Sequence, residues 1–279
     1  MKRGYGGVTF SKVTPPTRIM KIAIVTGASS GIGREFAMML DRHEKLDEIW
    51  VIARREERLR ELSGVLKTKV RPVPLDLMRE SSYETYKALL AEQSPEVKVL
   101  VNGAGYGYFG EFTERTLEGQ LGMIDCNSRA VVALTYLTLP YMKEGGEIYN
   151  IASTSSFQPV PYIAVYGATK AFVMSFSRAV NREVRPRGIR VMAVCPHWCK
   201  TEFFDTAVTD DTIKYYNFFN DARDVAETAW RNMKRGRDVS LCGYKIKLQR
   251  LAVKLMPHSF VMNTWCRQQK KPTAKGNKY

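Results

Sequence analysis

The sequence predicts an α/β protein whose single domain contains a doubly wound parallel sheet. The first observation is a set of six short runs rich in Val, Ile and Leu, and the second is that longer amphipathic stretches separate them. Continuous apolar strands that alternate with helices are typical of parallel sheets covered on both faces. Right-handed crossovers then produce the doubly wound arrangement. The third observation is that no linker rich in Gly, Ser or Pro interrupts residues 20–243.

The expected elements follow in order along the chain. Each strand candidate is a short apolar run, and each helix candidate has apolar residues at three- and four-residue spacing. The expected strands are Lys21–Thr26, Glu48–Ala53, Val70–Leu75, Val97–Asn102, Glu147–Ala152 and Ile189–Cys195, and the expected helices include Ile32–Leu40, Glu56–Leu66, Tyr83–Ala91, Leu117–Met142 and Tyr162–Glu183.

Three segments lie outside this alternation. Residues 1–19 contain Gly and Pro pairs without periodicity, and we expect a disordered N-terminal extension. Residues 202–220 are rich in Phe and Tyr and follow the sixth strand. Residues 244–279 form a basic, amphipathic C-terminal extension. Within it, one helical face carries Leu248, Leu251, Ala252 and Leu255, and another carries Lys247, Arg250 and Lys254.

The extension is open to three interpretations. The leucine face packs on the core beside a solvated basic face, or the helix docks on an anionic membrane surface, or it contacts another subunit.

The charge of the chain is concentrated at its ends. The formal net charge is +15, yet residues 22–233 hold 26 basic and 27 acidic side chains. We therefore expect no specific nucleic-acid partner, because a neutral body lacks a broad phosphate-binding surface. The apolar share of 44% excludes a disordered chain. Five cysteines, an odd number without a CxxC pair, favour a reducing, cytoplasmic location.

A glycine-rich turn follows the first expected strand. It reads Thr26-Gly27-Ala28-Ser29-Ser30-Gly31-Ile32-Gly33 and opens an amphipathic helix. Glycines let a backbone turn tightly and approach a pyrophosphate, and the helix N-terminus adds N–H groups and partial positive charge. An ordinary Gly-rich βα turn is the alternative interpretation.

The second expected strand ends in Ala53-Arg54-Arg55, about twenty residues after the turn. A carboxylate at this place would accept a hydrogen bond from the adenosine 2′-OH, whereas a guanidinium can hold a 2′-phosphate. The residues therefore favour NADP(H), unless both arginines are ordinary charges of a first helical turn.

Tyr166 and Lys170 lie four residues apart, on one face of an expected helix. A neighbouring cation favours the phenolate, and we expect Lys170 to lower the pKa of Tyr166 into a range useful for proton transfer. Tyr and Lys at this spacing are common on surface helices, so the pair indicates a catalytic site only in combination with the other motifs.

Together and in this order, the motifs resemble those of the short-chain dehydrogenase/reductase family, and the resemblance covers residues 20–243. It implies the Rossmann-like fold of that family. The TGxxxGxG motif stands as Thr26–Gly33, and the NNAG motif appears as Asn102-Gly103-Ala104-Gly105. The YxxxK motif stands as Tyr166–Lys170, thirteen residues after Ser153.

The resemblance implies roles for individual residues. The implied catalytic residues are Asn127, Ser153, Tyr166 and Lys170. Cofactor contacts are implied for Gly27, Ser29, Ser30, Gly31, Ile32, Gly33, Arg54, Asp76, Leu77, Asn102, Ala104, Gly105, Tyr166, Lys170, Pro196 and Thr201. Substrate contacts are expected for Ser153, Tyr166, His197, Phe203 and Phe204, the last two within the substrate lid of about 202–220.

Two positions depart from the family pattern. Gly103 replaces the second Asn of NNAG, and His197 replaces the Gly that usually follows Pro196. We expect His197 to line the substrate site or to pack, with a role as an additional acid or base as the alternative. Cys195, His197 and Cys199 share one turn without a fourth ligand, so no metal site is expected.

The function implied is NADP(H)-dependent oxidoreduction between a ketone or aldehyde and an alcohol. The aromatic lid favours a lipophilic substrate, unless its aromatic side chains simply pack the lid onto the body. The alternatives are an oxidative, hydroxysteroid-type dehydrogenase and a non-catalytic nucleotide-binding module. The family also implies a homo-oligomer, a dimer or tetramer formed through the helices expected at 117–142 and 162–183.

Overall fold

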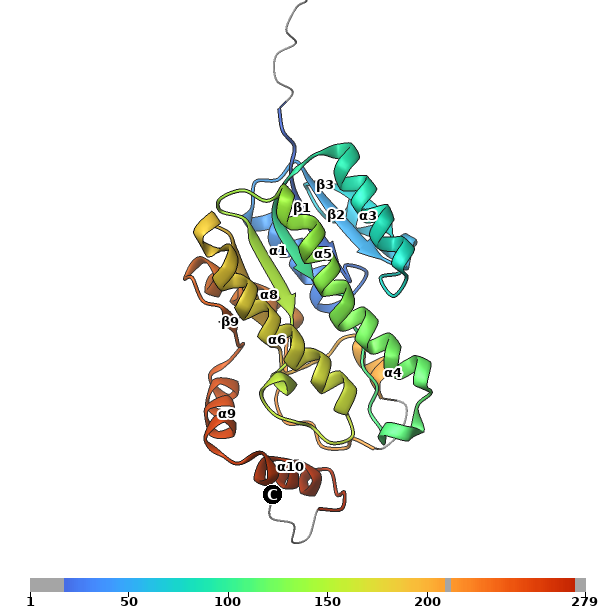
Figure 1. Cartoon of the computed structure of the whole chain (residues 1–279), viewed down its shortest axis with the longest axis vertical. Coiled ribbons are helices and arrows are strands. Elements are labelled where there is room, and N and C mark those ends of the chain that lie inside the picture. Colours follow the sequence, from blue (N-terminus) through green and yellow to red (C-terminus); the bar gives the residue numbers. More distant parts are fainter. Residues whose placement is uncertain (1–17, 209–211, 274–279) are drawn as a thin grey trace, which may run out of the picture.

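The central sheet brings together seven parallel strands (Figure 1) in the order β3-β2-β1-β4-β5-β6-β9. The computed structural model describes residues 18–208 and 212–273; the expectation of disorder at the N-terminus falls almost wholly outside these ranges. Six strands lie within one residue of the expected bounds, and β9 is an addition. The strands are β1 (Lys21–Thr26), β2 (Glu48–Ala53), β3 (Lys69–Pro74), β4 (Glu96–Asn102), β5 (Glu147–Ile151), β6 (Arg190–Val194) and β9 (Val239–Ser240).

Helices cover both faces of the sheet, as the sequence predicts. Phe36 and Leu40 of α1 and Met233 of α8 are buried on one face, whereas Tyr86 of α3 and Leu134 of α5 are buried on the other. The helices are α1 (Gly31–His43), α2 (Glu56–Glu61), α3 (Glu80–Gln93), α4 (Leu117–Ile124), α5 (Ala130–Thr138), α6 (Ala164–Val184), α7 (Phe203–Ala207), α8 (Ala222–Lys234), α9 (Tyr244–Leu255) and α10 (His258–Gln268).

The strand order reverses between β1 and β4, which are neighbours in the sheet although β2 and β3 separate them in sequence. In open α/β sheets, ligands bind at the carboxyl ends of the strands beside such a switch point. Below this edge, Asn102 of β4 donates its side-chain amide to Asn150 at 2.8 Å and to Thr135 at 3.2 Å. Asn102 therefore joins neighbouring elements inside the core.

The helix expected at 117–142 is broken. Asp125–Arg129 forms a π-helical turn between α4 and α5, and Leu139–Tyr141, which contains Pro140, forms a 3₁₀ turn. π-Helical turns insert an extra residue into the hydrogen-bond ladder and occur frequently at functional sites. Here the turn contains the buried Asn127.

The C-terminal extension forms two helices at the edge of the molecule, beyond the layers that cover the sheet (Figure 1). The expectation that its leucine face packs on the core is wrong. Leu248, Leu251 and Leu255 are exposed, whereas Ile246 is buried. The helix contacts the body through its opposite face, beside the 3₁₀ turn Thr154–Phe157. Within the described ranges, no helix is both long enough and apolar enough to cross a bilayer.

Candidate active site

The glycines at the loop between β1 and α1 occupy positions where a side chain would be strained or would collide with backbone. Gly27 and Gly31 have φ angles of 67° and 53°, a region that side chains disfavour. A Cβ on Gly27 would lie 2.7 Å from backbone atoms of Gly103 and Ala104, and one on Gly33 would strike the carbonyl of Gly27. The loop ends at the N-terminus of α1, so free N–H groups and partial positive charge meet at the cavity beside it.

Thr26 ties this loop to the end of β4. Its hydroxyl accepts hydrogen bonds from the N–H groups of Gly103 at 3.0 Å and Ala104 at 3.1 Å. A Cβ on Gly103 would lie 2.6 Å from the carbonyl oxygen of Thr26. In this chain the glycine therefore allows two chain segments to approach more closely than a side chain at position 103 would permit.

A cavity of about 450 Å³ extends from this loop along the carboxyl ends of the strands. Of the predicted cofactor contacts, Asn102 lies outside its lining. All predicted substrate contacts line it. The predicted residues that the cavity brings together are Gly27, Ser29, Ser30, Gly31, Ile32, Gly33, Arg54, Asp76, Leu77, Ala104, Gly105, Ser153, Tyr166, Lys170, Pro196, His197, Thr201, Phe203 and Phe204.

The two arginines after β2 have different surroundings. The Arg55 guanidinium lies 2.6 Å from the Glu202 carboxylate and donates to the Ser29 and Ser30 hydroxyls at 3.2 and 3.4 Å. This contact holds the pKa of Glu202 below its usual value. Arg54 is exposed at the cavity and makes no hydrogen bond or ion pair with its side chain among residues 18–208 and 212–273. Its guanidinium is therefore available to a bound anion.

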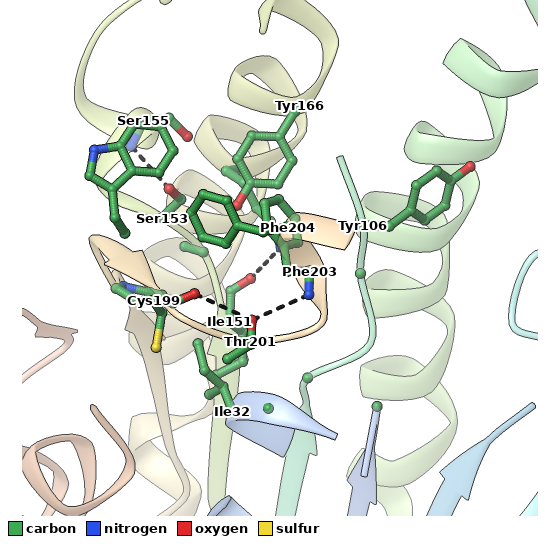
Figure 2. A pocket seen from close by; sticks show the side chains of 18 of the residues that line it. Ile32, Tyr106, Ile151, Ser153, Ser155, Tyr166, Cys199, Thr201, Phe203 and Phe204 are labelled. Carbon is green, nitrogen blue, oxygen red and sulfur yellow. Dashed lines mark hydrogen bonds between the residues drawn. The ribbon is translucent and has the colours of Figure 1, made fainter. Parts of the chain in front are cut away.

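Tyr166 and Ser153 point toward one another across the cavity (Figure 2). Tyr166 lies in the first turn of α6, and Ser153 follows β5. The Ser153 hydroxyl accepts a hydrogen bond from the N–H of Ser155 at 3.2 Å and also contacts the phenol. Lys170 lies one helical turn beyond Tyr166, and its Nζ donates to the carbonyl of Ile151 at 2.8 Å.

Burial dominates the protonation of this pair. It raises the pKa of Tyr166 to about 12, although the hydrogen bond with Ser153 acts in the opposite direction. Burial also lowers the pKa of Lys170 to about 8. The expectation that Lys170 lowers the phenol pKa is thus not met in the protein alone. The physical reason is that desolvation disfavours phenolate, while Nζ lies over the ring, 5.6 Å from its centre.

Asn127 is completely buried behind the cavity. Its side-chain oxygen accepts from the N–H of Tyr106 at 3.1 Å, and its Nδ2 donates to the Tyr106 carbonyl at 2.9 Å and to Thr169 at 3.1 Å. A Cβ on Gly105 would lie 2.8 Å from the Asn127 oxygen and 3.3 Å from Lys170 Nζ. Asn127 therefore fixes the loop after β4 next to Lys170.

His197 bridges two segments of the substrate region. Its Nε2 lies 2.6 Å from the side-chain oxygen of Asn217, and its Nδ1 lies 2.9 Å from the Thr154 hydroxyl. An amide oxygen only accepts, so Nε2 carries the proton and Nδ1 accepts from Thr154. Burial lowers the pKa of His197, which favours this neutral form. The ring thus joins the turn Thr154–Phe157 to the segment that contains Asn217 while it lines the cavity.

The far end of the cavity is aromatic. Phe203 packs against Tyr166 with ring centres 5.4 Å apart, and Phe204 packs against Trp198 and Tyr216. Sequence reasoning missed that the C-terminal extension completes this end. The cavity residues from the extension are Ile246, Gln249, Arg250, Val253, Trp265 and Gln268. The seven-residue spacing of Ile246 and Val253 was an available signal, but the more apolar leucine face obscured it.

Gln269 of the extension holds the lid in place. Its side-chain oxygen accepts from the N–H groups of Lys214 at 2.9 Å and Tyr215 at 3.0 Å, and its amide donates to the Tyr215 carbonyl at 3.0 Å. Gln269 is 1% exposed. Nearby, the indole of Trp265 donates to the carbonyl of Pro161 at 3.0 Å. The extension is therefore part of the cavity wall and also supports the segment at Lys214 and Tyr215.

The arrangement fits a nicotinamide dinucleotide. The loop at Gly27 and Gly33, where a Cβ would collide with backbone, leaves space for a pyrophosphate beside the N-terminus of α1. Arg54 and Lys170 line the same continuous cavity as this loop. Within the described ranges, no cluster of His, Cys, Asp and Glu side chains is arranged as a metal site.

Comparison with known proteins gives consistent results. The sequence model of the short chain dehydrogenase family matches residues 21–212. An uncharacterised oxidoreductase of Staphylococcus epidermidis is 32% identical over 194 residues, which cover 69% of this chain and 81% of that protein. Very-long-chain 3-oxoacyl-CoA reductase of Homo sapiens is 34% identical over 192 residues, covering 64% of this chain and 60% of that enzyme.

A solved structure supports the same relationship. The short-chain dehydrogenase from Sphingobium yanoikuyae in complex with NADPH superposes with a TM-score of 0.73 at 28% identity, covering 84% of this chain and 92% of that chain. With the family motifs in order, the parallel sheet and these similarities, the chain belongs to the short-chain dehydrogenase family of oxidoreductases.

Proposed function

We propose that the protein is an NADP(H)-dependent oxidoreductase that interconverts a lipophilic ketone or aldehyde and its alcohol, with Tyr166 as general acid and base. One observation carries the proposal: Tyr166, Ser153 and Lys170 meet in a cavity that continues into the glycine loop. A positioned proton donor beside a dinucleotide site is what carbonyl reduction requires.

Each catalytic side chain has a distinct role. Tyr166, with its pKa raised to about 12 by burial, is held protonated and donates its proton to the substrate oxygen during reduction. Ser153 donates a hydrogen bond to that oxygen and positions it. Lys170 would hold the nicotinamide ribose when the cofactor binds, and Asn127 fixes the adjoining loop. The bound nicotinamide supplies or accepts the hydride.

Replacing the Tyr166 hydroxyl tests this function. In Tyr166→Phe we expect a fall in kcat of at least about 100-fold, because a positioned proton donor typically contributes ~10²–10⁴ in rate. The measurement is NADPH absorbance with a long-chain 3-oxoacyl thioester, a steroid ketone and a small aldehyde. Tyr141→Phe, remote from the cavity, is the control. Turnover within threefold of wild type in Tyr166→Phe contradicts the assignment.

The preference for NADP(H) rests on Arg54. Its exposed guanidinium lies at the cavity without a protein partner among the described residues, and no carboxylate occupies the end of β2. A guanidinium can hold a 2′-phosphate through charge-assisted hydrogen bonds. The similar dehydrogenase from Sphingobium yanoikuyae was solved with NADPH.

A charge change at Arg54 tests this preference. We expect Arg54→Ala to raise the KM for NADPH at least about tenfold, because the free energy of one charge-assisted hydrogen bond to the 2′-phosphate is lost. The KM for NADH should stay within about twofold of the wild-type value, because NADH has no 2′-phosphate. Steady-state kinetics with both cofactors measures the two values. A wild-type enzyme that prefers NADH, or an equal loss with both cofactors, is incompatible with the proposed role.

The lipophilic substrate is supported by the aromatic end of the cavity. Phe203, Phe204, Trp198 and Trp265 line it, and Ile246 and Val253 add aliphatic surface. The similar human enzyme is named for reduction of very-long-chain 3-oxoacyl-CoA. A substrate panel in which only small polar carbonyl compounds react contradicts this part of the proposal.

A homo-oligomer in the cytoplasm completes the proposal. Large apolar side chains are exposed along α4, α5 and α6, where a second subunit would cover them: Leu117, Leu121, Ile124, Val132, Tyr136 and Phe172. All five cysteines are unpaired, as a reducing compartment favours.

A further inference from the structure

The outer face of α9 carries an exposed apolar stripe. Tyr244, Leu248, Leu251 and Leu255 are 75%, 65%, 54% and 76% exposed. Their spacing of four, three and four residues places them on one face of the helix. We call these four residues the leucine stripe. Met256 and Phe260, which follow in the chain, are exposed as well.

The stripe cannot turn inward, because the opposite face of α9 already contacts the body. Ile246 is 3% exposed, and Ile246, Arg250 and Val253 line the substrate cavity. The Arg250 guanidinium lies 5.0 Å from the ring centre of Phe157. The helix is thus apolar on two opposite faces, and only the inner face is covered.

Basic side chains border the leucine stripe on both sides. At 100° per residue, Lys247 and Lys254 lie along one edge and Lys245 along the other, and all three are exposed. Residues 244–273 contain seven lysines and arginines and no aspartate or glutamate. An apolar stripe between lysines is the pattern of helices that lie in the interface of an anionic bilayer.

We propose that the leucine stripe docks α9 on an anionic phospholipid surface. The leucines enter the region between headgroups and acyl chains, and the three lysines reach the phosphates. A symmetric contact with a second copy of this chain is disfavoured, because it would bring the lysine borders together without an acidic partner. Charge complementarity therefore selects a lipid surface as the occupant.

Docking has a consequence for substrate entry, and this part rests on the proposed function. The inner face of α9 lines the cavity that contains Tyr166, and α10 adds Trp265 to the same wall. Docking through the outer face places that cavity within one helix diameter, about 10 Å, of the lipid. A lipophilic substrate dissolved in the bilayer can then reach the cavity with little exposure to water.

The test is flotation of the full chain with vesicles of phosphatidylcholine, with and without phosphatidylglycerol. We expect wild type to float only with the anionic vesicles and to be released by salt. Leu248→Ser/Leu251→Ser/Leu255→Ser should weaken binding at least about tenfold, and Lys247→Gln/Lys254→Gln should do the same. Circular dichroism and NADPH binding establish that each variant is folded.

Matched controls carry the same substitutions elsewhere on the exposed surface. These are Ile19→Ser/Val65→Ser/Phe112→Ser and Lys45→Gln/Lys87→Gln, and both should float as wild type does. Failure of wild type to float at low salt overturns the proposal, as does equal flotation of the leucine variant. Self-association that depends on the leucines without vesicles also overturns it, in favour of a second copy.

The docking and catalytic proposals fail separately. Flotation measures vesicle binding without turnover, so its result tests the docking proposal independently of which substrate the enzyme reduces. If both hold, anionic vesicles should raise kcat/KM for a bilayer-soluble ketone and leave that for a small aldehyde unchanged. Stimulation of both substrates alike, or of neither, contradicts delivery from the lipid.

Discussion

At Tyr166 and Lys170, burial shifts two neighbouring titratable groups in opposite directions. Both shifts disfavour charge, which raises the pKa of the phenol and lowers that of the ammonium. Lys170 is therefore charged below about pH 8 and neutral above it, while Tyr166 keeps its proton to about pH 12. The titration of Lys170 is the one expected to shape the rate near neutrality.

We expect kcat/KM for carbonyl reduction to stay level below about pH 8 and to fall above it, as the Lys170 cation is lost. In Lys170→Arg the guanidinium remains charged throughout, so a slower enzyme should show no such decline. Initial rates with NADPH between neutral and alkaline pH provide the measurement. Persistence of the decline in Lys170→Arg would assign it to another group.

At the scale of elements, α4, α5 and α6 combine a buried face that supports the site with an outer apolar face. The π-helical turn at Asp125–Arg129 brings Asn127 inward, while Tyr136 of α5 remains 77% exposed. These exposed apolar residues are where the proposed homo-oligomer would form its interface.

Charged substitutions on this face should dissociate the proposed homo-oligomer. We expect Val132→Lys/Tyr136→Lys to weaken subunit association at least about 100-fold, because like charges facing each other in an interface cost several kcal/mol. Sedimentation velocity measures the mass of the particle. Ile19→Lys/Val65→Lys adds the same charge on exposed apolar positions outside α4, α5 and α6 and should leave the mass unchanged. A monomeric wild type would refute the expectation.

The sequence was a good guide to elements whose signal is local. Six strands could be located from continuous apolar runs, because a strand that is buried on both faces carries apolar side chains at nearly every position. β9 has only two residues, too few for a recognisable run. In the extension, α9 is apolar on two faces, and no periodicity indicates which face the body covers. The ion pair of Arg55 with Glu202, residues 147 apart, depends on tertiary structure alone.

At the scale of the whole molecule, the uneven distribution of charge along the sequence corresponds to a division in the structure. The nearly neutral segment forms the first six strands of the sheet, most of its covering helices and the proposed catalytic residues. The basic C-terminal part adds β9 and closes the aromatic end of the cavity. The order of motifs predicted the site as a group, because strand ends in a parallel sheet meet at one edge. The contribution of the extension to that site required the three-dimensional structure.

The three hydrogen bonds of Gln269 to the segment at Lys214 and Tyr215 join two distant parts of the chain into a single structural unit. A chimera that imports only one of the two from a homologue would leave a buried amide without partners and an unsupported loop. Redesign of substrate scope therefore has to transplant both as a matched pair.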